Sequence, residues 1–132
     1  MPKDKHKAPS LATPVGKIKW RDEVADHDYD SAEAYLSIKL ERAAVAGLVA
    51  RLRKAPLTTR RANDILRAAG LTAAPLDDPG VIKDLVKVIE GTRLSPVLVV
   101  RDAGGADIAD GYHRVSLVYR IDPYGTVPLK LG

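Results

Sequence analysis

The sequence of 132 residues contains no cysteine, no phenylalanine and a single tryptophan, Trp20. Without cysteine the chain can form no disulfide, no cysteine nucleophile and no thiolate metal site. Because aromatic residues are so scarce, the core must be built mainly from Leu, Val, Ile and Ala. No apolar run approaches the roughly 20 residues that a membrane-spanning helix needs, and no hydrophobic signal core follows the basic N-terminus. We therefore expect a cytoplasmic protein with no membrane partner.

What is present is the composition of an ordinary globular chain. Hydrophobic residues make up 45% and charged residues 29%, in a length that fits one domain. The formal net charge of +4 is compatible with a nucleotide or nucleic acid as partner, and equally with neither. Few large apolar side chains stand among the first residues, so we expect a flexible basic tail over 1–16 and a single domain over 17–132.

The first half of the domain reads as helical. A capping box of Asp30 and Glu33 predicts a helix that runs from residue 30 to about Lys54, before Pro56. Thr58 or Thr59 would cap a second helix over 60–69, and Asp78-Pro79 would open a third that closes at Gly91. The apolar stripes expected to face inward are Val45, Leu48, Val49 and Leu52 in the first helix, Ile65 and Leu66 in the second, and Ile82, Leu85, Val86 and Ile89 in the third.

The second half changes to strand patterns. The β-branched run over 96–100 predicts a buried strand, which a turn at 102–105 joins to a short strand over 107–109. A helix is expected over 112–121 and a last strand over 127–131, where Pro128 favours an edge or an end. Three helices followed by a β-β-α-β unit predict an α+β fold with a small mixed sheet.

The segment from Asp110 to Arg114 joins the second strand to the helix after it. Free N–H groups at a helix start attract anions, and Gly111 lets an anion approach the backbone closely. His113 and Arg114 add donors, and the arginine fork suits phosphate. The alternative is that Asp110 caps the helix, Gly111 makes the turn, and the two basic side chains are solvated.

Residues 95–131, SPVLVVRDAGGADIADGYHRVSLVYRIDPYGTVPLKL, resemble the ParB/sulfiredoxin superfamily. The shared order is an apolar strand after proline, a turn, a short strand ending in Asp-Gly, and two basic residues that open a helix. In that superfamily this loop holds nucleotide phosphates, and its members include CTP-binding partition proteins, ATP-using sulfiredoxins, free-serine kinases and nucleases. The resemblance implies a nucleotide-binding protein, with or without phosphoryl transfer or nucleotide hydrolysis, that takes ATP, ADP or CTP together with Mg²⁺.

Site residues can be carried over by position. Gly111 matches the loop glycine, and His113 and Arg114 match its two basic positions, so residues 111–114 are the predicted phosphate-binding loop. Tyr112 stands where sulfiredoxins carry their catalytic cysteine, which rules out their chemistry here. Asp110 matches the aspartate of the kinase-like members, as a catalytic group or a ligand to Mg²⁺. Those members also take a base from an upstream acidic residue, for which the candidates are Glu23, Asp26 and Asp28.

A DNA-binding module is the alternative function. Arg60, Arg61 and Arg67 make the second predicted helix basic, and a helix after a short turn can act as a recognition helix. Such a partition-like or nuclease-like module would bind DNA without nucleotide turnover. The segment from Asp110 to Arg114, which we call the Asp-Gly corner, would then be purely structural. Solvated helix faces explain the same arginines, and an adaptor that keeps the fold without a ligand is a third reading. The substrate and the oligomeric state stay open.

Overall fold

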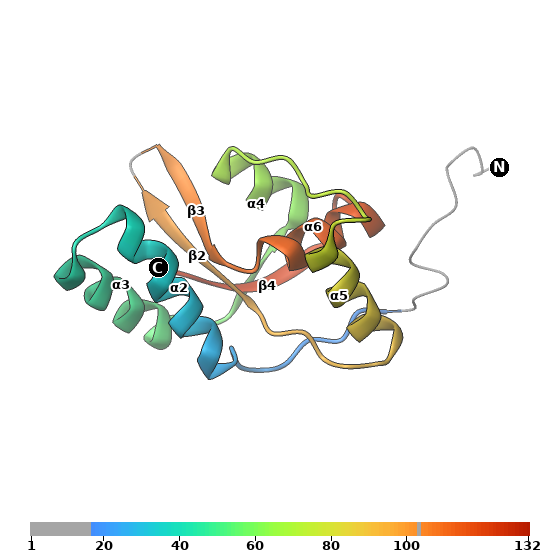
Figure 1. Ribbon diagram of the computed structural model, residues 1–132, viewed down its shortest axis with the longest axis horizontal. Coiled ribbons are helices and arrows are strands. Elements are labelled where there is room, and N and C mark those ends of the chain that lie inside the picture. The colour runs from blue at the N-terminus through green and yellow to red at the C-terminus, as the bar shows by residue number, and fades with distance from the viewer. Residues whose placement is uncertain (1–16, 103) are drawn as a thin grey trace.

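The computed structural model describes residues 17–102 and 104–132, so the tail predicted over 1–16 lies outside the described residues. Within them, five helices surround a mixed sheet of four strands (Figure 1), which confirms the α+β class. No helix in the described ranges has the length and apolar character needed to cross a membrane. In chain order the elements are α2 (Asp26–Lys39), α3 (Arg42–Lys54), β1 (Thr58–Arg61), α4 (Ala62–Ala69), α5 (Pro79–Ile89), β2 (Val97–Asp102), β3 (Gly105–Asp110), α6 (Tyr112–Ile121) and β4 (Thr126–Leu131).

The strands are arranged in the order β1-β4-β2-β3. β2 forms a hairpin with β3 and lies parallel to β4, with Val97 opposite Leu129, while β1 pairs antiparallel with β4. The order β2, β3, α6, β4 is the β-β-α-β unit expected from the sequence. Helix α6 is the crossover that makes the parallel pairing of β2 and β4 possible.

Helices cover both faces of the sheet (Figure 1), and successive residues of β2 show why. Leu98 and Val100 pack with α2 and α3, whereas Val97 and Val99 pack on the other face with α4 and α6. Because side chains alternate along a strand, a strand buried on both faces reads as one continuous apolar run. Helix α5 packs on α6 in a third cluster.

The single helix expected from residue 30 to Lys54 is wrong. The chain forms two helices that break at Leu40, whose φ of −133° is extended, and α2 already begins at Asp26. Asp30 therefore lies inside α2 and caps nothing, and the N-cap is Ala25, whose N–H donates to Ser95 Oγ at 3.0 Å. The break lets α3 fold back, so that Leu52 enters the same cluster as Leu36.

A strand replaces the expected start of the second helix. Residues Thr58–Arg61 form β1, and α4 begins only at Ala62, with Gly70 closing it in the left-handed conformation. Thr59 pairs with Pro128, so β4 lies between β1 and β2, and Pro128 lies neither on an edge strand nor at the end of its strand, contrary to expectation. Ile65 and Leu66 are buried, as expected.

The expected inward stripe of α5 is largely wrong. Ile82, Val86 and Ile89 are exposed, and Val81 and Val88 are buried in their place. The reason lies at the start of the helix, where a Cβ on Gly80 would come within 2.6 Å of the His113 ring. This close packing of α5 on α6 turns the face that carries Val81 inward. The expected N-cap is confirmed, because the Asp78 carboxylate accepts from the N–H groups of Gly80 and Val81.

Candidate functional site

The chain turns sharply at Gly111, between the end of β3 and the start of α6. Its φ of 113° lies in the left-handed region that favours glycine. A Cβ on Gly111 would also lie 2.7 Å from a methyl group of Val97 and 2.9 Å from Arg114 Nη2. Both the backbone conformation and the space available therefore require glycine here.

The first turn of α6 opens onto a pocket. Its first helical hydrogen bond runs from Val115 N–H to the Gly111 carbonyl, so the N–H groups before Val115 have no partner within the helix. Gly111 has no side chain with which to cap them. We call the adjoining pocket, of about 580 Å³, the corner pocket; it is lined by Ser31, Tyr35, Leu71, Ile108, Ala109, Asp110, Gly111, Tyr112 and His113.

Arg114 does not line the corner pocket. Its Nη2 lies 2.9 Å from Asp110 Oδ2 and 3.4 Å from Asp28 Oδ2, and its side chain is only 15% exposed. The guanidinium thus joins a carboxylate at the end of β3 to one in the first turn of α2. Arg114 Nε is buried with no hydrogen-bond partner among the described residues. Arg114 is therefore neither a solvated side chain nor a fork turned towards the pocket.

Asp28 is the upstream acidic residue that the fold brings to this corner. Its side chain is 5% exposed, and His27 Nε2 lies 3.2 Å from its other oxygen. Glu23 and Asp26 instead line a separate pocket beside Arg53. Of the three acidic candidates, only Asp28 is therefore in contact with the Asp-Gly corner.

The pKa of Asp110 is raised above its ordinary value, chiefly because burial disfavours the charged carboxylate. The Arg114 guanidinium opposes this shift, and the neighbouring Asp28 carboxylate adds to it. Asp110 also lines the corner pocket. A carboxylate with a raised pKa that reaches a pocket holds a proton more readily than an exposed aspartate does.

Tyr112 and His113 are held in place by the loop between α4 and α5 and by the start of α5. The Tyr112 hydroxyl donates to the Thr72 carbonyl at 2.6 Å, and His113 Nε2 lies 3.2 Å from Asp78 Oδ2. The backbone of Gly80 lies against the His113 ring. Both side chains line the corner pocket, so the start of α5 and the loop before it fix one wall of that pocket.

Asp84 is a residue of this region that the sequence patterns did not reveal. It is buried in α5, and burial raises the pKa of its carboxyl, while Arg114 is the largest influence that lowers it. Its position three residues after Val81 and four before Val88 places it on the buried face of the helix. That spacing becomes informative only once Val81 and Val88, rather than Ile82 and Ile89, are known to face inward.

The described residues do not build a metal site of their own. Among 17–102 and 104–132, no group of three or more His, Asp or Glu side chains is arranged to hold a metal ion. Asp110 reaches the corner pocket alone, and Asp28 is turned towards Arg114 and His27. The expected Mg²⁺ therefore finds one carboxylate in this pocket, which is fewer protein ligands than a dedicated cage supplies.

The three arginines of the DNA-binding alternative do not line the corner pocket. Arg60 and Arg61 belong to β1, not to a helix, and Arg60 Nη1 donates to Thr58 Oγ1 and the Thr59 carbonyl. Arg61 lies over the Tyr124 ring, and Arg67 pairs with Asp64 at 3.0 Å. Because a strand precedes α4 directly, the expected turn before a recognition helix is absent from this segment.

The comparisons with known proteins return no match to a family model, to a curated protein or to a solved structure. The resemblance of residues 95–131 to the ParB/sulfiredoxin superfamily therefore stays a prediction that rests on the motif itself.

Proposed function

We propose that this protein binds a nucleotide in the corner pocket, with a phosphate group against the N-terminus of α6. One observation carries the proposal: the uncapped N–H groups that follow Gly111 open onto a pocket lined by Gly111, Tyr112 and His113 themselves. Such N–H groups, together with the helix dipole, favour a phosphate at this point. The likeness of the loop to nucleotide-binding members of the ParB/sulfiredoxin superfamily supports the same reading.

A nucleotide suits the corner pocket better than a free phosphate ion does. The pocket has about 580 Å³, within the range of small-molecule sites. Two tyrosines line it, Tyr35 from α2 and Tyr112 from α6, and aromatic rings are good partners for a stacked base. A nucleotide would therefore contact both surfaces of the pocket, with its phosphate at the N-terminus of α6 and its base near the two tyrosines.

Arg114 has an indirect role in this proposal. Two carboxylates close to the phosphate would repel it, and the guanidinium between Asp28 and Asp110 offsets part of their negative charge. The donors that meet the phosphate are then the backbone N–H groups and His113, which is half exposed beside Asp78. This assigns direct contact to residues 111–113 and charge compensation to Arg114.

Phosphoryl transfer is the reaction that the carboxylates would support. A hydroxyl group, from water or from an acceptor alcohol, would attack the terminal phosphorus and give its proton to Asp110. The new O–P bond forms as the bond to the bridging oxygen breaks, and that oxygen leaves with the nucleotide. The raised pKa of Asp110 and its place in the pocket wall suit a proton acceptor. In this assignment Asp28 acts through Arg114 and Asp110.

Calorimetry with ATP, ADP, CTP and GTP, each with and without Mg²⁺, tests the proposal. Ser31 is exposed on α2 and lines the corner pocket, so Ser31→Trp should fill it and weaken binding at least about tenfold. Ser37→Trp, on the same helix outside the pocket, is the matched control and should bind as the unmodified protein does. If no nucleotide binds at millimolar concentration, the nucleotide proposal fails and the adaptor reading replaces it.

A further inference from the structure

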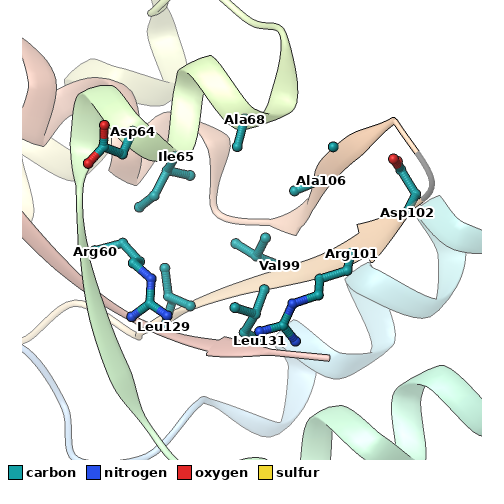
Figure 2. Close-up of a pocket in the computed structure, with 11 residues that line it drawn as sticks. Arg60, Asp64, Ile65, Ala68, Val99, Arg101, Asp102, Ala106, Leu129 and Leu131 are labelled. Carbon is teal, nitrogen blue, oxygen red and sulfur yellow. The ribbon is translucent and has the colours of Figure 1, made fainter.

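A second pocket, shown in Figure 2, is lined by residues of the β2–β3 hairpin. It lies at the other end of this hairpin from the corner pocket. The corner pocket adjoins Asp110, where β3 ends, whereas this one adjoins Asp102 and Gly105, where β2 ends and β3 begins. We call it the sheet-face pocket; it has about 500 Å³ and is lined by Arg60, Asp64, Ile65, Ala68, Val99, Arg101, Asp102, Gly105, Ala106, Leu129 and Leu131.

The floor of the sheet-face pocket is apolar because the core reaches the surface here. Val99, Leu129 and Ile65 belong to the cluster between the sheet and α4. Ala68, near the end of the eight-residue helix α4, lines the pocket together with Arg101 and Leu131, near the ends of β2 and β4. At the hairpin, a Cβ on Gly105 would lie 2.4 Å from the Ala68 carbonyl, so β3 and α4 meet and bound the pocket on that side.

The charged side chains around this floor are not evenly placed. Figure 2 shows the guanidinium groups of Arg60 and Arg101 on one side of the pocket, next to Leu129 and Leu131. Arg60 is held there by its bonds to Thr58 Oγ1 and the Thr59 carbonyl.

The two carboxylates lie at opposite ends of the view and have partners of their own. Asp64 pairs with Arg67, and Asp102 Oδ1 accepts from the Gly104 N–H at 3.0 Å. The side near Leu129 and Leu131 is therefore positively charged.

We infer that the sheet-face pocket binds a medium-chain aliphatic carboxylate. The alkyl chain would lie on the apolar floor between α4 and the sheet, and the carboxylate would meet Arg60 and Arg101. Arginine forks match carboxylate geometry, and an apolar pocket with a few polar groups at one side fixes a ligand's direction. None of the described residues that line this pocket is aromatic, so it differs from the corner pocket in the ligand class that it suits.

Titration of the full chain with decanoate, below its micelle concentration, tests this inference by calorimetry and by amide NMR. Binding should be saturable, and the shifted amides should cluster in α4 and around residues 99–106 and 129–131. Decanol and decyltrimethylammonium have the same chain with a neutral or cationic head. Because the arginines select a carboxylate, both should bind at least about tenfold more weakly than decanoate.

Three variants locate the site. Ala68 is exposed, so Ala68→Trp should fill the pocket without disturbing the core and abolish decanoate binding. The double variant Arg60→Gln with Arg101→Gln should weaken it about tenfold to a hundredfold. Arg51→Gln, an exposed arginine of α3 outside the pocket, is the matched control and should bind normally.

Several outcomes would overturn the inference. One is the absence of saturable decanoate binding at millimolar concentration, and another is equal affinity for decyltrimethylammonium. Unchanged affinity in both Ala68→Trp and the double arginine variant would show that the ligand binds elsewhere. Nucleotide titration of the same variants should be unaffected, so this test stands apart from that of the corner pocket.

Discussion

Asp28 and Arg114 are 86 residues apart in the sequence, yet Asp28 Oδ2 lies 3.4 Å from Arg114 Nη2. Asp28 stands in the first turn of α2 and Arg114 in the first turn of α6, and both side chains are largely buried. The same guanidinium nitrogen lies 2.9 Å from Asp110 Oδ2. One cation therefore ties the two helix starts to the end of β3, beside the corner pocket.

Arg114→Ala should destabilise the fold strongly, because it leaves the buried carboxylate of Asp28 and the partly buried carboxylate of Asp110 without their cation. Removing one partner of a buried ion pair typically costs about 3–5 kcal/mol of the free energy of unfolding. Arg114→Lys should recover only part of this loss, since the shorter lysine keeps the positive charge but does not place its ammonium group where Arg114 Nη2 lies, next to both carboxylates. Urea unfolding at neutral pH measures the difference.

Arg51→Ala is the control for that comparison, since Arg51 is exposed, and its effect should stay within about 0.5 kcal/mol. A loss of similar size in Arg114→Ala and Arg51→Ala would show that the contacts to Asp28 and Asp110 contribute little to stability.

The elements around this ion pair differ in how far the sequence predicted them. Helix α6 has the expected bounds, and β2 covers most of the expected range but runs on to Asp102, because a β-branched run and the Gly111 turn are local signals. The expected turn at Gly111 is confirmed, since the backbone conformation and the close packing there both need a residue without a side chain.

The missed features depend on contacts between separate elements, which local sequence patterns do not encode. The break at Leu40 follows from α3 folding back onto α2, and β1 exists because Thr59 finds Pro128 on β4. The pattern of α5 allowed two inward faces, and only its contact with His113 decides between them. For the same reason, the resemblance left three upstream acidic candidates open, and only the fold shows that Asp28 is the one in contact with Arg114.

The pH dependence of stability should reveal the buried carboxyl of Asp84. Its pKa is raised in the folded protein from an ordinary value of 3.8, so the folded state favours the protonated form. The stability that this carboxyl contributes is therefore fully present below its unfolded pKa and is lost as the pH rises through its folded pKa. Asp84→Asn removes the titration, so its stability relative to the unmodified protein should increase with pH across that window.

Urea unfolding of both proteins at a series of pH values, from strongly acidic to neutral, measures this difference. Asp64→Asn, the same carboxyl-to-amide change at a partly exposed position on α4, is the matched control. A stability difference for Asp84→Asn that decreases as the pH rises would contradict the assignment.

Gly47 and Gly80 should respond oppositely to alanine. Gly47 lies inside α3 with nothing within 4 Å of an added Cβ, so Gly47→Ala should stabilise the protein by about 0.5–1 kcal/mol through helix propensity. At Gly80 the Cβ would lie 2.6 Å from the His113 ring, so the same change must displace that ring or the start of α5.

Thermal unfolding compares the two alanine variants directly, and amide NMR shows whether Gly80→Ala shifts residues 111–114. Stabilisation by both substitutions, with the His113 amide unshifted, would show that α5 does not pack closely on α6 at this point.

Asp78 combines two contacts that substitution can separate. Its carboxylate caps α5 through the N–H groups of Gly80 and Val81, and it lies 3.2 Å from His113 Nε2. Asp78→Ala removes both contacts and should cost about 1 kcal/mol of stability for the lost cap. Asp78→Ser restores a capping oxygen but not the carboxylate beside His113, so it should recover most of the stability.

If the contact with His113 orients that ring for the proposed nucleotide, both variants should bind nucleotide more weakly, whatever their stability. Unfolding curves and calorimetry on the same two proteins give both readings, and normal nucleotide affinity in Asp78→Ser would remove this orienting role from Asp78.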